Sequence, residues 1–467
     1  MTSTSSTQEE KTVPIDSDVL VIGGGLAGVA SAIAAARTGA DVRLVSSKKS
    51  TLRQASGLID GLGYVPTRTS LTEHAEYLSQ ERKDVREVRA QRGGFHGPLT
   101  TPFEGFELLP DEHPYSILGR GALKDGLALF DEIVGDHYLG SHTERNALMP
   151  TFGGSVKPTA RYPRAAAAGI ASDDRPMLII GFHSLIEFTG GMVADQLAAI
   201  GVPFDVRGVD VSFTEAFQTD AAVTRFSRAL DYDEPIGGTP ARRALARAVK
   251  SHVGDAERIG FPAFLGDRNA RAVRRELTDR LGAAVFELPM GPPSLPGLRL
   301  EDRLFEALND EGVRVETGIP AVGFEADGDW ISSVLIDRKG QQVPYTADSF
   351  VLATGGLVGK GLDSDREAVR EPLFDCYVPQ PADRYNWFVD DAFGDHPFAR
   401  FGVRPDRSMR PLTADGEPEF ANLTAAGAVV GGADVAREKS ASGVSLATGL
   451  VAGQTAGTVA QQDEMTP

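Results

Sequence analysis

Short apolar runs that end near glycines are the clearest pattern at the start of the chain. Residues 19–22 (VLVI) form a β-branched run that is typical of a buried parallel strand. Residues 29–37 follow with helical apolar spacing, and a second apolar run at 42–45 comes after Gly39, a residue type that often ends a helix. The pattern predicts a β-α-β unit over residues 17–46.

The middle of the chain alternates helical stretches with isolated apolar runs. Helices are expected over residues 67–91, 118–133, 190–200, 239–253 and 269–281. Strands are expected at residues 177–182, 206–213 and 285–288. The Gly- and Pro-rich stretch 93–114 is expected to be a long ordered loop. No repeat links these elements, and they indicate an inserted α+β domain that ends at residues 291–297 (GPPSLPG).

The last third of the chain returns to an α/β pattern. A helix is expected at 300–311, strands at 313–315, 321–325, 331–337, 349–353 and 423–426, and a final helix at 443–460. The predicted fold class is α/β, with a Rossmann-like domain whose mainly parallel sheet is built from discontinuous segments, and with the inserted α+β domain. The expected Rossmann-like segments are residues 15–66, 297–357 and 420–462.

The remaining segments have other expected roles. Residues 67–296 would form the inserted substrate or cap domain, and residues 358–419 a loop-rich excursion. Residues 1–14 are rich in Ser, Thr and Glu and lack a basic start and an apolar core, so a disordered tail is expected rather than a secretion signal.

Composition and charge narrow the class of protein. The 467 residues are 41% apolar, have a mean hydropathy of -0.16, and contain no apolar run long enough to span a membrane. The net charge of -18 argues against nucleic-acid binding. The basic residues are 10 Lys and 37 Arg, which fits either a high-salt cytosol or a GC-rich genome. The single cysteine, Cys376, excludes internal disulfides and cysteine-ligated metal clusters, and no metal is expected.

The first apolar strand runs into a glycine motif. Gly23, Gly25 and Gly28 form G-x-G-x-x-G between the strand and the helix. Gly23 would allow a tight turn, Gly25 would let the backbone approach a pyrophosphate, and Gly28 would let the helix lie close to the strand. The phosphate would rest at the N-terminus of the helix, where N–H groups and the helix dipole favour negative charge.

Two further small-residue motifs lie far along the chain. One is 351–356 (VLATGG), where a strand ends in a turn, and the other is 422–427 (NLTAAG), followed by 442–447 (SGVSLA). The last helix would direct its N-terminus at the pyrimidine ring of a flavin and stabilise the negative charge of the reduced form. Each motif alone could be an ordinary turn or helix cap. All three together, in this order, predict a nucleotide or flavin site.

These segments carry a family resemblance. The chain resembles flavoproteins of the succinate dehydrogenase/fumarate reductase class and, more narrowly, the family of B subunits of anaerobic glycerol-3-phosphate dehydrogenase. The narrower resemblance lies in residues 21–28 (VIGGGLAG), 50–60 (STLRQASGLID), 353–356 (ATGG) and 422–432 (NLTAAGAVVGG). Related flavoproteins carry other residues in place of Ala-Ser-Gly-Leu-Ile-Asp60.

The resemblance implies a heteromeric enzyme that oxidises glycerol 3-phosphate to dihydroxyacetone phosphate. A larger FAD-containing catalytic subunit and a membrane-anchored iron–sulfur subunit would be the partners, and electrons would pass towards quinone. FMN is the implied cofactor of this chain, with FAD as the alternative. Localisation would be cytoplasmic, or peripheral on the inner face of the membrane through the partners. The positions expected to bind the cofactor are Gly23, Gly25, Gly28, Ser46, Ser56, Gly57, Thr354, Gly355, Gly427, Gly443 and Val444.

The chain departs from flavoproteins of this class in two ways. The acidic residue that commonly binds the adenosine ribose at the end of the second strand is replaced by Ser46, followed by Lys48 and Lys49. Ser46 could still bind a ribose hydroxyl, and a lysine could neutralise the phosphate of FMN or a 2′-phosphate, although exposed lysines are often only solvated. No histidine lies between residues 46 and 64, so any flavin is expected to be non-covalent.

Catalytic residues are harder to assign from the sequence. Oxidation of a secondary alcohol needs a base, and a phosphate needs Arg or Lys. Arg161, Arg164 and His183 in the inserted region are weak candidates, with a surface basic pair and a histidine beside a strand as the alternative. His96 and His113 are uncommitted. Cys376 is expected to be a small buried residue rather than a redox thiol.

Three functions remain open at this point. The first is a flavin subunit of glycerol-3-phosphate dehydrogenase. The second is a stand-alone FAD-dependent oxidoreductase of another small substrate. The third is a non-catalytic assembly subunit that has lost its cofactor. The intact glycines count against the third function, because glycine weakens structure unless a close backbone approach requires it.

Overall fold

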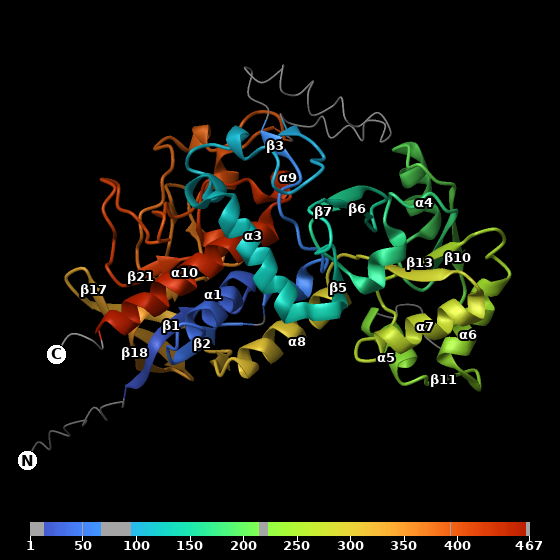
Figure 1. Cartoon of the computed structure of the whole chain (residues 1–467), viewed down its shortest axis with the longest axis horizontal. Helices are drawn as coiled ribbons and strands as arrows, with labels where there is room; N and C mark the ends of the chain where they lie inside the picture. The colour runs from blue at the N-terminus through green and yellow to red at the C-terminus, as the bar shows by residue number, and fades with distance from the viewer. Residues whose placement is uncertain (1–13, 49, 67–94, 214–222, 393, 464–467) are drawn as a thin grey trace, which may run out of the picture.

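The computed structural model describes residues 14–48, 50–66, 95–213, 223–392 and 394–463 (Figure 1). The helix expected over residues 67–91 lies outside the described residues, as do Lys49 and all but the last residue of the expected N-terminal tail.

A seven-stranded sheet forms the centre of the first lobe. Its order is β15-β2-β1-β18-β17-β16, and β21 pairs with the C-terminal end of β18. The β15–β2, β2–β1, β1–β18 and β18–β21 pairs are parallel, whereas β17 pairs antiparallel with both β18 and β16. The strands are β1 (Ile15–Ile22), β2 (Val42–Ser46), β15 (Arg314–Thr317), β16 (Ala321–Asp327), β17 (Trp330–Arg338), β18 (Gln341–Leu352) and β21 (Leu423–Ala425). The prediction of a Rossmann-like, mainly parallel sheet is confirmed.

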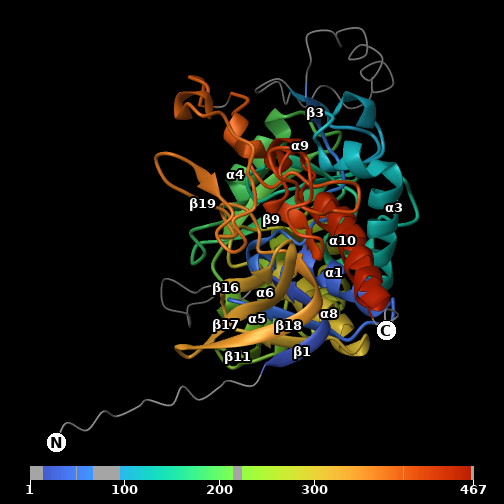
Figure 2. The same cartoon turned by 90° about the vertical axis from the view of Figure 1, so that its left-hand side faces the viewer.

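Helices from distant parts of the chain pack on this sheet. Helices α1 (Leu26–Ala36), α8 (Leu295–Asp310) and α10 (Ala441–Asp463) contact its strands, and α3 (Pro114–Val134) packs against α10 and α8. Helix α10 contacts both α1 and α3, and strands β17, β18 and β1 lie below α1 and α10 in the view of Figure 2. Val19, Leu20 and Val21 on β1 are fully buried, as expected for a parallel strand covered on both faces.

A second lobe contains a four-stranded sheet of order β10-β9-β13-β14, on the right-hand side of Figure 1. Its strands are β9 (Met177–Phe182), β10 (Val206–Val211), β13 (Arg258–Pro262) and β14 (Ala284–Leu288). Its helices are α4 (Gly190–Ala199), α5 (Val223–Asp231), α6 (Ala241–Lys250) and α7 (Ala270–Leu281). All three strand pairs are parallel, so the main sheet of the inserted region is of α/β type, not the α+β type expected.

Short elements complete the two lobes. The two-residue and four-residue strands are β3 (Val65–Pro66), β4 (Phe95–His96), β5 (Tyr138–Leu139), β6 (Ala147–Pro150), β7 (Val156–Thr159), β8 (Tyr162–Pro163), β11 (Pro235–Ile236), β12 (Thr239–Pro240), β19 (Asp363–Ser364) and β20 (Val369–Arg370). The short helices are α9 (Val435–Glu438) and the 3₁₀ turns η1 (Thr51–Gln54), η2 (Phe106–Leu108), η3 (Gly135–His137), η4 (Arg164–Gly169), η5 (Arg384–Asn386), η6 (Pro397–Arg400) and η7 (Gly427–Val429). No helix in the described part of the chain combines the length and the apolarity needed to cross a membrane.

Several element boundaries differ from those expected. Helix α8 begins at Leu295, inside the segment 291–297 that was expected to be a boundary. Pro296 is compatible with this start, because a proline in the first turn lacks only an N–H that has no helical partner there. The expected strand 349–353 is the end of the twelve-residue β18. Strand β13 was missed, since its Arg258 and Gly260 interrupt the apolar pattern.

The packing also bears on the division into domains. Buried residues of α3, including Leu127 and Phe130, belong to the core of the first lobe, although the expected inserted domain covers residues 67–296. Helix α8 contributes Leu300 and Leu304 to that core, whereas its first residue, Leu295, packs in the core of the second lobe. The domain boundaries stay a prediction, and this packing favours placing α3 with the larger sheet.

A buried ion pair joins α8 to the second lobe. Nη1 of Arg299 lies 2.6 Å from Oε2 of Glu287 on β14, and Glu287 also accepts a hydrogen bond from the Leu265 N–H at 2.7 Å. The Glu287 side chain is only 2% exposed. Removal of one partner from a buried pair leaves an uncompensated charge, which is strongly destabilising.

We expect Arg299→Met to lower the free energy of unfolding by about 3 kcal/mol, because Glu287 would remain buried without its partner. Arg303→Met is the matched control, since Arg303 forms an exposed pair with Glu306 one turn later on α8, and it should change stability by less than about 0.5 kcal/mol. Urea unfolding of both variants tests this. Equal losses of unfolding free energy in the two variants would contradict the proposal that the Arg299–Glu287 pair stabilises the contact between α8 and the second lobe.

Candidate flavin-binding site

The three small-residue motifs meet at one edge of the larger sheet. Strands β1, β18 and β21 are parallel neighbours, so their carboxyl ends lie at the same edge. The Ala353 N–H donates to the Ile22 carbonyl at 2.9 Å, and the Ala426 N–H donates to the Leu352 carbonyl at 2.9 Å. Ligands of open α/β sheets bind at this edge.

Two glycines of the first motif are required by close backbone contacts. A Cβ at Gly23, whose φ is +131°, would lie 2.0 Å from the Ala353 carbonyl oxygen. A Cβ at Gly28 would lie 1.9 Å from the Gly23 carbonyl oxygen. The turn, the start of α1 and the end of β18 are therefore in direct backbone contact.

Gly25 has a different environment. It is the N-cap residue of α1, and a Cβ at this position would meet nothing within 4 Å. No side chain in the described part of the chain caps the helix, and its first turn contains no acidic residue. The first N–H groups of a helix have no partner within the helix, so this end of α1 can accept an anion such as a pyrophosphate.

The other two motifs line the same helix end. The Thr354 Oγ1 atom is buried and has no hydrogen-bond partner among the described residues, which makes it available to a bound group. Gly355 and Gly427 have φ values of +92° and +76°, and a Cβ at Gly427 would lie 2.6 Å from Cβ of Ala27 on α1. These residues fit a cradle for the phosphate part of a flavin nucleotide.

Ser46 lies at the end of β2, the strand next to β1. Its hydroxyl donates to the Lys48 carbonyl at 2.8 Å, while the Lys48 side chain is exposed. The hydroxyl oxygen can still accept a hydrogen bond. The geometry thus leaves Ser46 available as a ribose acceptor, and it gives Lys48 no contact that indicates a phosphate.

The Ala-Ser-Gly-Leu-Ile-Asp60 segment contains Ser56 and Gly57, whose contact with a cofactor stays a prediction. The Ser56 hydroxyl accepts from the Leu58 N–H at 3.3 Å. Gly57 has a φ of +76°, and its carbonyl accepts from the Tyr138 hydroxyl at 2.9 Å. The Asp60 carbonyl accepts from the Gly443 N–H at 2.7 Å. This segment therefore reaches the start of α10.

The N–H groups at the start of α10 are already hydrogen-bonded within the protein, which the sequence did not indicate. The Gly443 N–H is used by Asp60, and the Val444 N–H donates to the Ser440 carbonyl at 2.8 Å. A Cβ at Gly443 would lie 2.2 Å from the Tyr115 hydroxyl oxygen. Gly443 thus permits tight packing against α3, and direct contact of Gly443 and Val444 with a flavin stays a prediction.

The weak catalytic candidates do not converge. Arg161 makes a two-pronged pair with Asp131 on α3, at 2.7 and 2.8 Å, and also donates to the Ala160 carbonyl. Arg164 donates to the Asp136 carbonyl at 2.6 Å. His183 is exposed after the end of β9. Each has its own surroundings, and the contacts give Arg161 a structural role.

A buried polar group near α10 was not singled out from the sequence. His113 caps α3: its Nδ1 accepts from the Tyr115 N–H at 2.9 Å, and its Nε2 lies 3.0 Å from Oε2 of Glu438. Because Nδ1 accepts a hydrogen bond, the neutral ring carries its proton on Nε2. The Nε2–H group therefore donates to the Glu438 carboxylate. The carboxylates of Glu438 and Asp60 both act on Tyr115, and Asp60 is paired with Lys157. No spacing in the sequence brings residues 60, 157 and 439 together.

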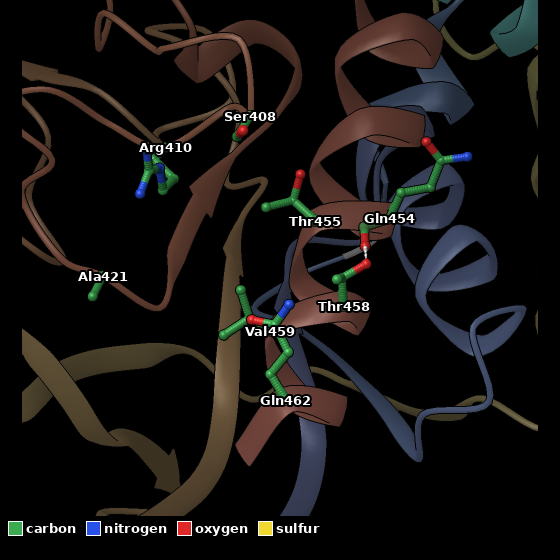
Figure 3. Close-up of a pocket in the computed structure, with 8 residues that line it drawn as sticks. All are labelled: Ser408, Arg410, Ala421, Gln454, Thr455, Thr458, Val459 and Gln462. Atoms are coloured by element: carbon green, nitrogen blue, oxygen red, sulfur yellow. Dashed lines mark hydrogen bonds between the residues drawn. The ribbon is translucent and has the colours of Figure 1, made fainter. Parts of the chain in front are cut away.

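A hollow of about 430 Å³ lies elsewhere, along the second half of α10 (Figure 3). Its lining residues are Ser408, Arg410, Ala421, Gln454, Thr455, Thr458, Val459 and Gln462. Thr455 is about 18 Å from Gly443 along the helix axis, at about 1.5 Å per residue. The hollow is therefore separate from the glycine site.

The comparisons with known proteins agree with this geometry. Residues 18–444 match the sequence model of the family described as FAD binding domain, so the chain belongs to a flavin-binding family of oxidoreductases. It is 52% identical, over 454 residues, to the probable B subunit of the anaerobic glycerol-3-phosphate dehydrogenase of Halobacterium salinarum, covering 96% of this chain and all of that protein. The chain belongs to the family of anaerobic glycerol-3-phosphate dehydrogenase B subunits.

More distant relatives have the same name. The B subunit of the anaerobic glycerol-3-phosphate dehydrogenase of Vibrio cholerae is 28% identical, with 92% of this chain and 94% of that protein covered. Among solved structures, a flavocytochrome c3 fumarate reductase in its open conformation is 13% identical, with 96% of this chain and 79% of that chain covered and a TM-score of 0.41. A likeness of that size adds nothing about the site.

Gly28 and Gly25 provide a matched pair of variants. Gly28→Ala should lower the free energy of unfolding by about 2 kcal/mol, because its Cβ would overlap the Gly23 carbonyl. Gly25→Ala should leave stability within about 0.5 kcal/mol of wild type, because its Cβ meets no protein atom and its φ of -82° suits alanine. Gly25→Ala should nevertheless weaken flavin binding about tenfold or more, because the Cβ enters the space expected for the pyrophosphate.

Urea unfolding and fluorescence titration with flavin measure the two effects. Unchanged flavin affinity in Gly25→Ala would place the cofactor away from the start of α1.

Cys376 is buried, as expected. Burial raises the pKa of its thiol, and the nearby Glu371, Glu419 and Asp375 charges raise it further. Since the thiolate is the reactive form, a disulfide reagent should modify the folded protein at least about a hundredfold more slowly than the urea-unfolded protein. Prompt modification of the folded chain would indicate that this thiol is accessible.

Proposed function

We propose that this chain is the flavin-carrying subunit of an anaerobic glycerol-3-phosphate dehydrogenase, and that it helps to oxidise glycerol 3-phosphate to dihydroxyacetone phosphate. The observation that carries this proposal is the 52% identity to the Halobacterium salinarum protein across nearly the whole chain. The meeting of Gly23, Gly25 and Thr354 at the uncapped start of α1 supports a flavin nucleotide as the redox group.

FAD is the flavin that we propose. The match to an FAD binding domain over residues 18–444 favours FAD over the FMN that the family resemblance implied. Gly25 and the first turn of α1 would hold the pyrophosphate, and Thr354 would donate or accept one hydrogen bond. Ser46 would replace the usual acidic residue at the adenosine ribose. The described contacts leave these groups available for such a ligand.

Partner subunits follow from the designation of the relatives as B subunits of a dehydrogenase. We propose an FAD-containing catalytic subunit and a membrane-anchored iron–sulfur subunit as the partners. This chain would then lie at the inner face of the membrane through its partners, and electrons would pass from the flavin towards quinone.

The residues of this chain would hold and orient the flavin. A bound flavin supplies a two-electron acceptor for the hydrogen on carbon 2 of glycerol 3-phosphate. The N-terminus of α1 would stabilise the phosphate charge, and the backbone contacts among Gly23, Gly28 and Ala353 would fix the turn that carries it.

The first experiment is an absorbance spectrum of the purified chain, followed by denaturation and chromatography of the released cofactor. We expect flavin bands from the native protein and release of FAD into the supernatant on denaturation, because no histidine lies between residues 46 and 64 to form a covalent link. Addition of glycerol 3-phosphate to the assembled complex should bleach the flavin bands.

Each outcome assigns a role. Release of FMN would be compatible with an electron-relay role of this chain, and it would contradict the proposal that the cofactor is FAD. Failure to bind either flavin after reconstitution would reject the redox role of this chain and favour an assembly subunit. A flavin that remains with the denatured protein would contradict non-covalent binding.

A further inference from the structure

A buried carboxylate, Asp60, lies where the two lobes meet. Its side chain is 6% exposed, and its Oδ2 accepts from Nζ of Lys157 on β7 at 2.7 Å. The other oxygen, Oδ1, is buried and has no hydrogen-bond partner among the described residues. A buried carboxylate oxygen without a partner is costly, so its retention indicates a ligand group.

A second lysine faces the same carboxylate. Lys439 follows α9 and adopts a φ of +52°, a left-handed conformation that favours glycine. One of its ammonium hydrogens goes to the Ala436 carbonyl at 2.6 Å, which leaves two further donors.

The charges in this group depend on each other. Burial raises the pKa of Asp60, and the positive charges of Lys157 and Lys439 oppose the rise. Burial and the charge of Lys157 lower the pKa of Lys439. Burial, followed by the carboxylates of Glu438 and Asp60, raises the pKa of the Tyr115 phenol. Among the described residues, the ionisable groups that face Asp60 are thus Lys157, Lys439 and Tyr115.

The position of the group also fits a ligand site. The Asp60 carbonyl binds the Gly443 N–H at the start of α10, beyond the carboxyl edge of the larger sheet. Lys157 comes from β7, whose neighbour Val156 packs in the core of the second lobe. Small-molecule sites lie preferentially between domains and at this edge of a sheet.

We infer that Asp60, Lys157 and Lys439 form the binding site for a small phosphorylated polyol, in which Asp60 accepts the proton of the hydroxyl group that is oxidised. The lysines would bind the phosphate oxygens by charge-assisted hydrogen bonds. This inference rests on the proposed function and adds to it a second site of substrate oxidation, in this chain, besides the one in the proposed catalytic partner. It assigns to this chain a base that the sequence candidates Arg161, Arg164 and His183 do not supply.

The proposed step is balanced. The O–H bond of the substrate hydroxyl breaks, and its proton goes to Oδ1 of Asp60. The carbon–hydrogen bond on the same carbon breaks, and the hydride, with its electron pair, goes to an oxidised flavin. The C–O bond becomes a carbonyl, so the polyol phosphate is oxidised to a keto phosphate while the flavin is reduced.

The first test is binding of glycerol 3-phosphate to the full flavin-loaded chain, measured by calorimetry. Lys157→Met should weaken binding at least about tenfold, because a charge-assisted contact is lost. Lys124→Met is the control, since the contact of Lys124 among the described residues is an exposed pair with Glu144. It should bind as wild type does.

Lys439→Gly separates a binding role from a structural one. Glycine relieves the left-handed backbone strain and so offsets part of the stability that is lost with the Lys439 charge near the buried Asp60, and the variant should stay folded. The same change removes a lysine from the site and should weaken glycerol 3-phosphate binding at least about tenfold. Weaker binding by this folded variant would indicate a binding role for Lys439, whereas wild-type affinity would indicate a structural one.

Asp60→Asn tests proton transfer. It should bind glycerol 3-phosphate within about threefold of wild type and slow flavin bleaching at least about a hundredfold, the usual contribution of a general base. In wild type, the bleaching rate should rise with pH as Asp60 ionises, and this rise should be absent from the residual rate of Asp60→Asn. Asp125→Asn, at an exposed position on α3, is the control.

The outcomes separate this inference from the proposed function. If the wild-type chain holds flavin but does not bind glycerol 3-phosphate, the inference is overturned and the electron-relay role stands. If Asp60→Asn bleaches at the wild-type rate, Asp60 is not the base. If Asp60→Asn fails to fold, the Lys439→Gly and Lys157→Met affinities decide the binding claim, and unchanged values overturn it. If wild type binds no flavin, the proposed function itself fails.

Discussion

The backbone contact among Gly23, Gly28 and Ala353 is the constraint on which the first lobe depends. These residues approach so closely that a side chain at Gly23 or Gly28 would overlap a carbonyl oxygen. The contact fixes the start of α1 against the ends of β1 and β18. The first N–H groups of α1 have no partner within the helix and no cap from a described side chain, so a ligand could bind them. Tight packing and anion binding therefore share one local geometry.

Much of this could be predicted from the sequence, because local signals carry it. The apolar run at 19–22 and the glycine spacing that follows indicate strand, turn and helix, and the structure has β1 and α1 there. The strand at residues 177–182 was predicted to the residue, since six consecutive apolar or small residues lie in a parallel sheet. Strand β13 was not predicted, because Arg258 interrupts its apolar pattern. The Arg258 side chain can be buried because its guanidinium donates hydrogen bonds to the carbonyls of Arg175 and Ala168.

The buried polar group shows why the rest could not be predicted. Asp60 belongs to a segment that the sequence marked as distinctive, but nothing local to it indicates a lysine partner. Lys157 lies in a four-residue strand, and Lys439 lies in a turn after a four-residue helix. Their meeting depends on how the two lobes pack, which is a property of tertiary structure. The sequence candidates Arg161 and His183 failed to converge for the same reason.

The last helix, α10, has a consequence for how the protein is made. It packs on α1 and α3, and its first turn is hydrogen-bonded to Asp60. The segments that contain Gly25, Asp60, Lys157 and Thr354 are all synthesised before it. During translation, these segments would emerge with one face of α1 uncovered and with Asp60 not yet held by Gly443. Cofactor loading should therefore follow synthesis of residues 441–463, and a nascent chain stalled before them would expose apolar surface that chaperones recognise.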